Sequence, residues 1–115
     1  MRRREDQIIP FEADILAAGL RMRVQGIPEF HGFQLAKEMR EGKSARALTS
    51  HGSLYKALTR MADNGLLESA WEDPQVAADE SRPRRRLYRV TSLGEIRLKA
   101  FEAPAPGRLR LADQS

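Results

Sequence analysis

The 115-residue sequence contains no cysteine, so disulfides, thiolate catalysis and cysteine-based zinc sites are all excluded. Histidine is scarce as well. His51 has no carboxylate or second histidine at ligand spacing, and His31 suits a structural cap or a buried hydrogen bond better than a metal. No nucleophile is paired with a base, and the sequence contains no phosphate-binding loop. We therefore expect no catalytic residue, no metal site, no cofactor and no enzymatic activity.

Long hydrophobic runs are also missing. No apolar stretch approaches the roughly 20 residues that a membrane-spanning helix needs. The opening MRRREDQ has the basic start of a signal peptide, but acidic residues and Pro10 follow where its apolar run should be. A cytoplasmic location is the expectation.

The residues that are present describe a single globular domain with room for one modest core, because 41% are hydrophobic and 31% are charged. There are 20 lysines and arginines against 16 acidic residues, and the net charge of +4 is a mild indication of an anionic partner. The distribution says more than the sum. Five arginines lie within Arg82–Arg89, and three more form Arg2–Arg4.

The stretch from Ser50 to Gly65 predicts one helix with both ends marked. The Ser50 hydroxyl can cap its start, and Gly65 supplies a left-handed stop. One face carries apolar residues at i, i+4 and i+7 and should anchor in the core: Leu54, Leu58 and Met61. The opposite face carries hydrogen-bond donors, two of them cationic: Ser53, Lys56, Thr59 and Arg60. This composition suits a helix laid into the major groove, and an ordinary amphipathic surface helix is the alternative.

Two further helices are expected before this one. The first runs from Pro10 to about Val24, with proline in its first turn. The second runs from about Gly32 to Glu41, with four residues facing inward: Phe33, Leu35, Ala36 and Met39. A polar link follows, with a possible short strand at 45–48.

After Gly65 the hydrophobic period becomes that of a strand, ending at Trp71. Residues 73–81 are rich in acids and alanine and are expected to form a loop, and a second strand is expected over 84–90. Ser92 and Glu95 have capping-box spacing and open a final helix to about residue 102, whose apolar residues are Leu93, Ile96, Leu98 and Phe101. The predicted fold is mainly α with a small β-hairpin. It is a winged helix-turn-helix with three helices, a two- or three-stranded wing and a C-terminal helix.

Three stretches resemble motifs of the PadR-like transcriptional regulators. HGFQLAKEM at His31–Met39 is similar to that family's second helix. GSLYKALTRMADNGLLES at Gly52–Ser69 resembles its recognition helix and first wing strand, including the Leu-Tyr pair and the Asn-Gly-Leu-Leu turn. RPRRRLYRVTSLG at Arg82–Gly94 is similar to its wing return. One departure is Ser81, which stands where the family usually has glycine before Arg-Pro-Arg.

The resemblance implies a homodimeric repressor that binds a palindromic operator in duplex DNA, with the first and last helices building the dimer. It divides the chain into a basic arm over 1–9, a winged-helix domain over 10–91, a dimerisation helix over 92–102 and a flexible tail over 103–115. Some family members also bind small aromatic molecules at the dimer interface, and Phe101 is the only aromatic residue on the last helix.

We expect DNA contacts from the third helix and from the wing. The helix contributes six residues: Ser50, His51, Ser53, Tyr55, Lys56 and Arg60. The wing contributes four: Arg82, Arg84, Arg85 and Arg86.

Several of these residues have second interpretations. The Tyr55 ring can pack on the second helix while its hydroxyl reaches DNA. Strand residues alternate in direction, so Arg85 or Arg86 is expected to pair with acids of the loop. Trp71 is expected to pack in the core or along the sheet edge.

The functional prediction is a transcriptional regulator that occludes a promoter, with two third helices in successive major grooves about 34 Å apart. Two alternatives stay open. One is a winged-helix module for protein interaction, favoured if the acidic loop Glu72–Glu80 masks the arginines. The other is a repressor that responds to a small aromatic effector bound between the first and last helices.

Overall fold

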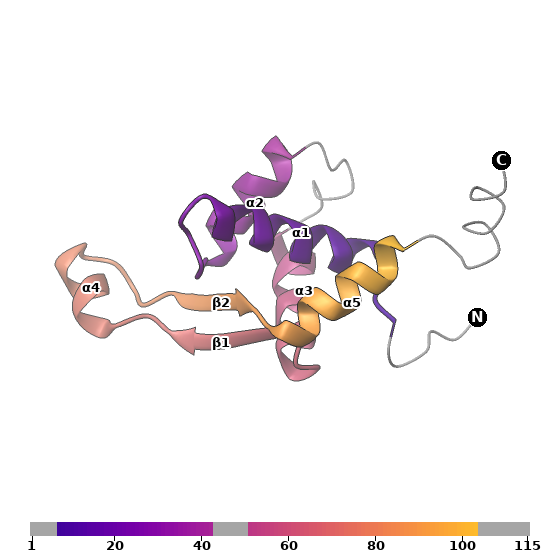
Figure 1. Cartoon of the computed structure of the whole chain (residues 1–115). Coiled ribbons are helices and arrows are strands. Elements are labelled where there is room, and N and C mark those ends of the chain that lie inside the picture. Colours follow the sequence, from indigo (N-terminus) through magenta and orange to yellow (C-terminus); the bar gives the residue numbers. More distant parts are fainter. Residues whose placement is uncertain (1–6, 43–50, 104–115) are drawn as a thin grey trace, which may run out of the picture.

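The structure, a computed structural model, describes residues 7–42 and 51–103. Three helices are followed by a hairpin with a small helix at its tip and by a final helix (Figure 1). The elements in chain order are α1 (Pro10–Val24), α2 (Gly32–Glu41), α3 (His51–Asp63), β1 (Leu67–Trp71), α4 (Pro74–Asp79), β2 (Arg86–Val90) and α5 (Ser92–Glu102). The predicted winged-helix order is confirmed. The possible strand at 45–48 and the cap assigned to Ser50 lie outside the described residues.

The starts of α1 and α2 follow from local capping. Pro10 occupies the first turn of α1, where its missing N–H costs nothing, and the Glu12 carboxylate accepts the N–H of Ile9 at 3.1 Å. At α2, Nδ1 of His31 accepts the Gln34 N–H at 3.3 Å, and the Gln34 side chain accepts the His31 N–H at 3.0 Å. The expectation that His31 is a structural cap is confirmed.

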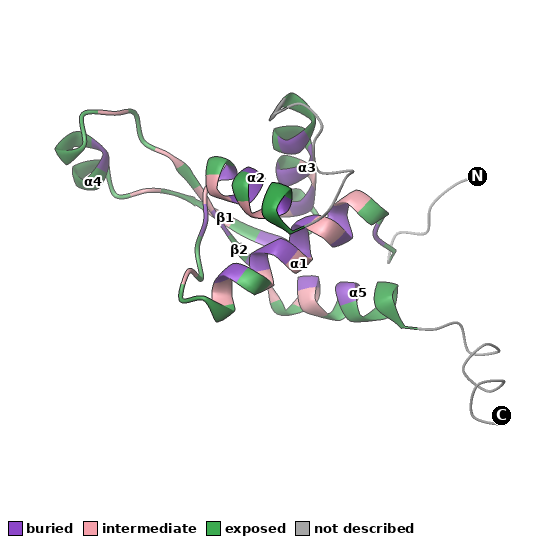
Figure 2. Ribbon diagram, turned by 90° about the horizontal axis from the view of Figure 1, so that it is seen from above, coloured by how far each residue is buried: buried purple, intermediate pink, exposed green. Residues whose placement is uncertain are grey.

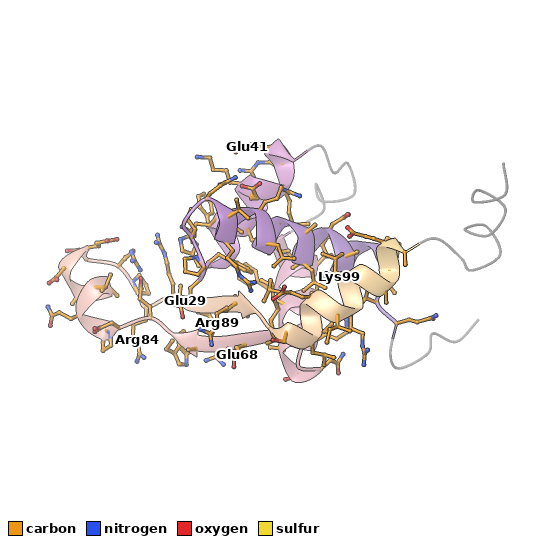
Figure 3. The ribbon with its side chains drawn as sticks, viewed as in Figure 1. Glu29, Glu41, Glu68, Arg84, Arg89 and Lys99 are labelled. Carbon is orange, nitrogen blue, oxygen red and sulfur yellow. The ribbon has the colours of Figure 1, made fainter. Side chains whose placement is uncertain are left out.

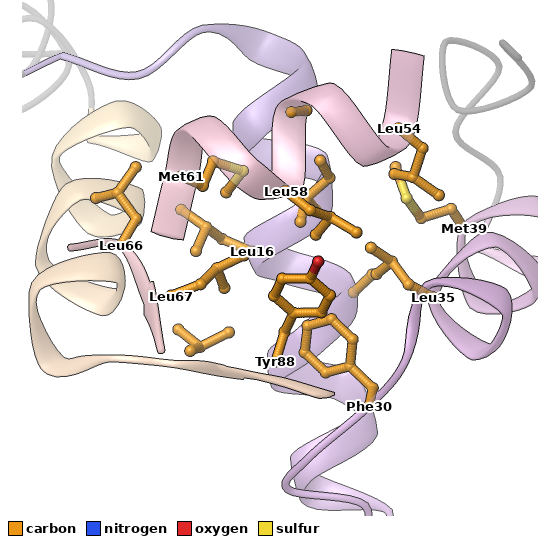
Figure 4. Close-up of a cluster of buried hydrophobic side chains, with 14 of the residues drawn as sticks. Leu16, Phe30, Leu35, Met39, Leu54, Leu58, Met61, Leu66, Leu67 and Tyr88 are labelled. Carbon is orange, nitrogen blue, oxygen red and sulfur yellow. The ribbon is translucent and has the colours of Figure 1, made fainter. Parts of the chain in front are cut away.

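The core lies where the first three helices meet the base of the hairpin (Figure 2). The predicted apolar face of α3 is fully used, because Leu54, Leu58 and Met61 are all buried. They pack with side chains from α1, α2, the α1–α2 connector and β2, and Figure 4 labels several of these: Leu16, Leu35, Phe30 and Tyr88. Gly65 ends α3 with φ of 80°, in the left-handed region predicted for it.

The hairpin is antiparallel, and its register runs from Leu67 opposite Val90 to Trp71 opposite Arg86. An isolated bridge joins Phe30 to Tyr88 through two backbone hydrogen bonds of 3.0 and 2.8 Å. This bridge attaches β2 to the connector between α1 and α2. The inner end of the wing is therefore held from both sides, whereas its outer end projects from the body (Figure 1).

The prediction of a loop over 73–81 is wrong, because α4 lies there. Asp73 accepts the Gln75 N–H at 2.8 Å as the helix cap, Pro74 fills the first turn, and Ala77 is buried. The chain leaves α4 through Ser81, whose φ of 55° is positive. This is the position where the resembling family usually has glycine, and a left-handed residue is the physical reason for such a preference. The second strand also begins at Arg86, two residues later than predicted.

Two details of the predicted helices need correction. Phe33 does not face inward: it is 61% exposed, because the buried stripe of α2 runs through Gly32, Leu35, Ala36 and Met39. The cap of α5 is Thr91 and not Ser92, since the Thr91 hydroxyl accepts the Gly94 N–H at 3.0 Å.

Candidate nucleic-acid interface

The face of α3 that points away from the core is exposed and polar. Ser53, Tyr55, Lys56 and Thr59 are all exposed, and a shallow surface hollow is lined by side chains of this helix. His51 begins the helix, and Ser50 lies outside the described residues. Among the described residues no carboxylate forms an ion pair with Lys56. Its positive charge is therefore available to an anionic partner.

Tyr55 lies against the start of α2. A Cβ atom added at Gly32 would come within 2.6 Å of the Tyr55 ring, so the close approach requires a residue without a side chain. The Tyr55 ring thus packs on the second helix, which was one of the two roles expected for it. The residue is still 44% exposed. The contact of its hydroxyl with DNA remains a prediction.

Arg60 has an intramolecular partner that the sequence interpretation missed. Its Nε donates to the Glu12 carboxylate at 2.9 Å, and Glu12 is only 1% exposed. The pair connects the outward face of α3 to the first turn of α1. The sequence did hold a signal, because Glu12 precedes Ile15 and Leu16 at helical spacing and so falls on the buried stripe of α1. A DNA contact by Arg60 remains a prediction.

Arg82 closes the outer part of the wing. Its guanidinium donates two bonds to the Glu72 carboxylate at 2.7 and 2.8 Å, and its Nε donates to Glu80 at 2.8 Å. These bonds from Arg82, with a further one from the backbone N–H of Arg85, lower the pKa of Glu72 from 4.5 to about 2. The expected pairing of the Arg85 or Arg86 side chain with the loop acids is wrong. Because α4 brings Glu72 and Glu80 together around Arg82, that arginine takes both.

Arg85 turns toward α2 and lies 3.2 Å from Nε2 of His31. Burial, followed by the charges of Arg85 and Arg82, lowers the pKa of His31. Since Nδ1 of the neutral ring accepts the Gln34 N–H, its proton belongs on Nε2, and the Arg85 contact is then a close approach between two donors. Protonation of His31 would remove the cap acceptor, so the structure favours the neutral ring.

Arg84 and Arg86 share one partner, Trp71. Their guanidinium carbons lie 5.6 and 5.0 Å from the centre of the Trp71 ring. Arg84 also donates to the Glu72 backbone carbonyl at 3.1 Å, and Arg86 donates to the Ser69 hydroxyl at 2.9 Å. Neither forms an ion pair with a carboxylate in the described part of the chain. Trp71 is 56% exposed, so it does not pack in the core; of the two expected settings, the sheet edge is the one that the structure shows.

The two faces of the hairpin differ in charge. Tyr88 and Arg86 are two residues apart in β2 and point to the same face, and Tyr88 packs in the core beneath the helices. Arg86 and its cross-strand partner Trp71 therefore lie on the side of the sheet that faces the helices. On the other face Arg89 pairs with Glu68, and Figure 3 shows the two on the hairpin.

Burial raises the pKa of Tyr88, while the positive charge of Arg86 opposes the shift and Tyr55 adds to it. Both Arg86 and Tyr55 thus lie near the Tyr88 hydroxyl.

Neither a metal centre nor a membrane helix is found in the described ranges. Residues 7–42 and 51–103 hold no group of three or more histidine, aspartate or glutamate side chains that could bind a metal ion. None of the helices there is long and apolar enough to cross a bilayer.

Solved structures with this fold come from PadR-type regulators. A PadR family transcription regulator from Clostridium difficile R20291 shares 25% identity, with 89% of this chain and 91% of that chain covered and a TM-score of 0.56. Bacillus subtilis PadR in complex with operator DNA shares 17% identity, covering 84% of this chain and 51% of that chain, with a TM-score of 0.59. The regulator TA0346 from Thermoplasma acidophilum shares 23% identity over 90% of this chain and 87% of that one, with a TM-score of 0.57.

No curated protein matches the chain. The model of the transcriptional regulator PadR-like family matches residues 24–100, which is well over half of the sequence and includes α2, α3 and the whole wing. This agrees with the resemblance seen in the three sequence motifs and with the expectation that the protein is not an enzyme. The chain belongs to the PadR-like family of transcriptional regulators.

Proposed function

We propose that the protein is a homodimeric repressor that binds a palindromic operator and occludes a promoter. The observation that carries the proposal is the positive charge that α3 and the wing hold without a carboxylate partner. Lys56 on α3 and Arg84 and Arg86 on the wing form no ion pair with a carboxylate in the described chain. Positive charge held without an internal partner is what a phosphate backbone requires.

The roles divide by position. The exposed face of α3 has the dimensions and polarity of a helix that enters the major groove, where Ser53, Tyr55 and Lys56 can reach base edges or phosphates. The arginines of the wing contact the backbone beside that groove. In a two-fold dimer the two α3 helices enter successive major grooves about 34 Å apart, which calls for a palindromic site.

The Bacillus structure supports DNA as the partner, because that protein was solved in complex with operator DNA. At 17% identity its likeness to this chain extends to the fold alone. Family membership supports the regulatory role, and the positive charges of α3 and the wing that lack carboxylate partners suit a DNA backbone.

A protein-interaction module is the alternative, and it requires that the acids of the wing mask its arginines. The structure limits that masking. Glu72 and Glu80 both pair with Arg82, and Asp73 and Asp79 bond within α4. Arg84 and Arg86 keep their charge, which favours the DNA proposal over the module.

The dimer is proposed to form through α1 and α5. These two helices pack against each other within the chain, and α5 leaves Ile96 57% exposed and Phe101 43% exposed. Large apolar side chains at such exposure along one short helix are suited to burial against a second copy.

DNA binding is tested with the purified protein and the duplex upstream of its own gene, over a series of salt concentrations beside a scrambled duplex. We expect tight binding to the upstream duplex alone, with a steep loss as salt rises. Lys56→Gln should weaken binding and lower the salt slope by about one. Equal, weak binding to both duplexes, unchanged by the substitution, would contradict the proposal.

Lys37→Gln is the matched control, because it removes the same charge from an exposed position on α2, outside both α3 and the proposed dimer helices. The control should therefore bind as the wild type does. A loss equal to that of Lys56→Gln would mean that net charge, and not the α3 face, governs binding.

The homodimer is tested by sedimentation of Ile96→Glu. Ile96 is exposed in the isolated chain, so a carboxylate there should leave the fold intact while weakening dimerisation by about a hundredfold or more. Wild-type protein that sediments as a monomer at all concentrations would remove the dimer from the proposal.

A further inference from the structure

The wing holds two arginines in an arrangement that the family assignment does not explain. Arg84 and Arg86 are two residues apart, both exposed, and both lie within 6 Å of the Trp71 ring centre. Trp71 is itself exposed at the end of β1, where it buries little apolar area. A large aromatic residue at such a site has a second use, because its ring face attracts guanidinium groups.

We propose that Trp71 is a positioning residue for DNA binding, which holds Arg84 and Arg86 as a prearranged pair for two neighbouring phosphates. The proposal rests on the proposed DNA-binding function and names the part of the wing that carries it. The ring orders the two guanidinium groups before DNA arrives, and it leaves both charges available.

The remaining bonds of the two side chains support this role. Arg84 donates to the Glu72 carbonyl and Arg86 to the Ser69 hydroxyl, at 3.1 and 2.9 Å. Both acceptors are neutral, so they orient the arginines without cancelling their charge. Arg82 is the contrasting case, since the two carboxylates that hold it more than cancel its positive charge.

The acids of the wing are arranged so that the pair stays unneutralised. Glu72 follows Trp71 directly, yet its carboxylate turns to Arg82 and to the backbone N–H of Arg85. The wing thus has an acidic tip, where Glu72, Asp73, Asp79 and Glu80 outnumber Arg82, and a cationic stem. The stem residues are Trp71, Arg84 and Arg86.

Prearrangement affects affinity in a way that can be separated from charge. A flexible arginine must lose side-chain freedom on binding, whereas a stacked arginine has lost part of it already. Removing the ring should therefore weaken binding while the number of phosphates contacted stays the same. Removing the arginines should weaken binding and also lower the salt dependence.

The experiment compares Trp71→Leu, Trp71→Phe and the double variant Arg84→Gln/Arg86→Gln on the upstream duplex across salt concentrations. We expect Trp71→Leu to lose about tenfold in affinity with an unchanged salt slope. Trp71→Phe should fall between it and the wild type. The double arginine variant should lower the slope by about two, one for each phosphate.

Arg89→Gln serves as the matched control, because it removes an arginine from the opposite face of the same hairpin, where Glu68 pairs with it. It should change neither affinity nor slope appreciably. Trp71→Leu with wild-type affinity would overturn the proposal. So would a fall in slope as large as that of the double arginine variant, because Trp71 would then be acting on charge and not on position.

A second measurement does not depend on the operator. Trp71 is the only tryptophan in the chain, so its fluorescence reports this site alone. Iodide should quench it more efficiently than neutral acrylamide does in the wild type, because the two guanidinium groups attract the anion, and this excess should vanish in Arg84→Gln/Arg86→Gln. If iodide quenches wild-type Trp71 no more efficiently than acrylamide does, the placement of the two guanidinium groups at the ring is refuted. An excess without any binding to the upstream duplex refutes the proposed function and leaves the cationic stem in place.

Discussion

Two regions of the molecule use arginine in opposite ways. At the junction of α1 and α3, Arg60 meets Glu12, a carboxylate with 1% exposure. On the stem of the wing, Arg84 and Arg86 meet the exposed ring of Trp71. A carboxylate partner cancels the charge and fixes two elements together, whereas an aromatic face holds a guanidinium group and leaves its charge intact. The neighbour, and not the residue type, decides whether an arginine serves the fold or a partner.

The largest effect is expected at the junction. Arg60→Ala removes the guanidinium from the buried Glu12 carboxylate and should lower the free energy of unfolding by about 2 kcal/mol, a value reduced from that of a fully buried pair because Arg60 is 41% exposed. Urea denaturation measures it, with Lys56→Ala on the exposed face of the same helix as the control. Equal stability of the two variants would show that the pair contributes nothing to the fold.

The next effect is expected at the tip of the wing. Arg82→Gln separates Glu72 from Glu80 and should speed hydrogen exchange of the α4 amides by about tenfold, while those of α1 and α2 keep their rates. Arg84→Gln is the control, because no carboxylate holds that side chain in the described structure. If both variants exchange at the same rate, the distinction between tip and stem fails.

Acid should loosen the same tip. The pKa of Glu72 lies at about 2 in the folded chain, below its ordinary value of 4.5. Its contribution is therefore present above pH 4.5 and is lost as the pH falls from 4.5 toward 2. Trp71 fluorescence should change over that window in the wild type and much less in Glu72→Gln. The control Glu41→Gln, on α2, should titrate as the wild type does.

The smallest effect on stability is expected from the titration of His31, which caps α2 and lies beside Arg85. Burial and the charges of Arg85 and Arg82 lower its pKa in the folded state, so the unfolded chain takes up the proton first. Stability should then decline as the pH falls below about 6.5. His31→Asn keeps a side-chain acceptor for the cap and removes the titration. Thermal unfolding at pH 7 and pH 5.5 should show a smaller difference for this variant. An equal difference would mean that other groups titrate there.

Local sequence signals predicted the helices of the body well. The bounds of α1 and α2, the buried face of α3 and the left-handed Gly65 all follow from proline, glycine and apolar spacing, and each is confirmed. The failures have local causes too. The Asp-Pro start of α4 was a capping signal obscured by an acidic composition, and Phe33 falls off the stripe that begins with Gly32.

Candidate contacts were harder to assign, because their roles depend on residues far away in sequence. The hydrogen bond of Arg60 to Glu12 spans 48 positions, and the contact of Arg85 with His31 spans 54. Periodicity describes which face of an element is buried and carries no information on which distant side chain meets it. The sequence identified the wing arginines as one cationic group. The structure shows that they differ in their partners, because α4 brings Glu72 and Glu80 to Arg82 alone.

By itself the sequence determined the order of the elements apart from α4, the winged-helix class and the family, since these depend on turn residues, caps and motifs within short windows. Only the tertiary structure decided which positive charges are neutralised. A carboxylate cancels a guanidinium charge only within a few ångströms. Folding sets those distances, and it brought Glu12 to Arg60 and Glu72 to Arg82 while leaving Arg84 and Arg86 beside Trp71.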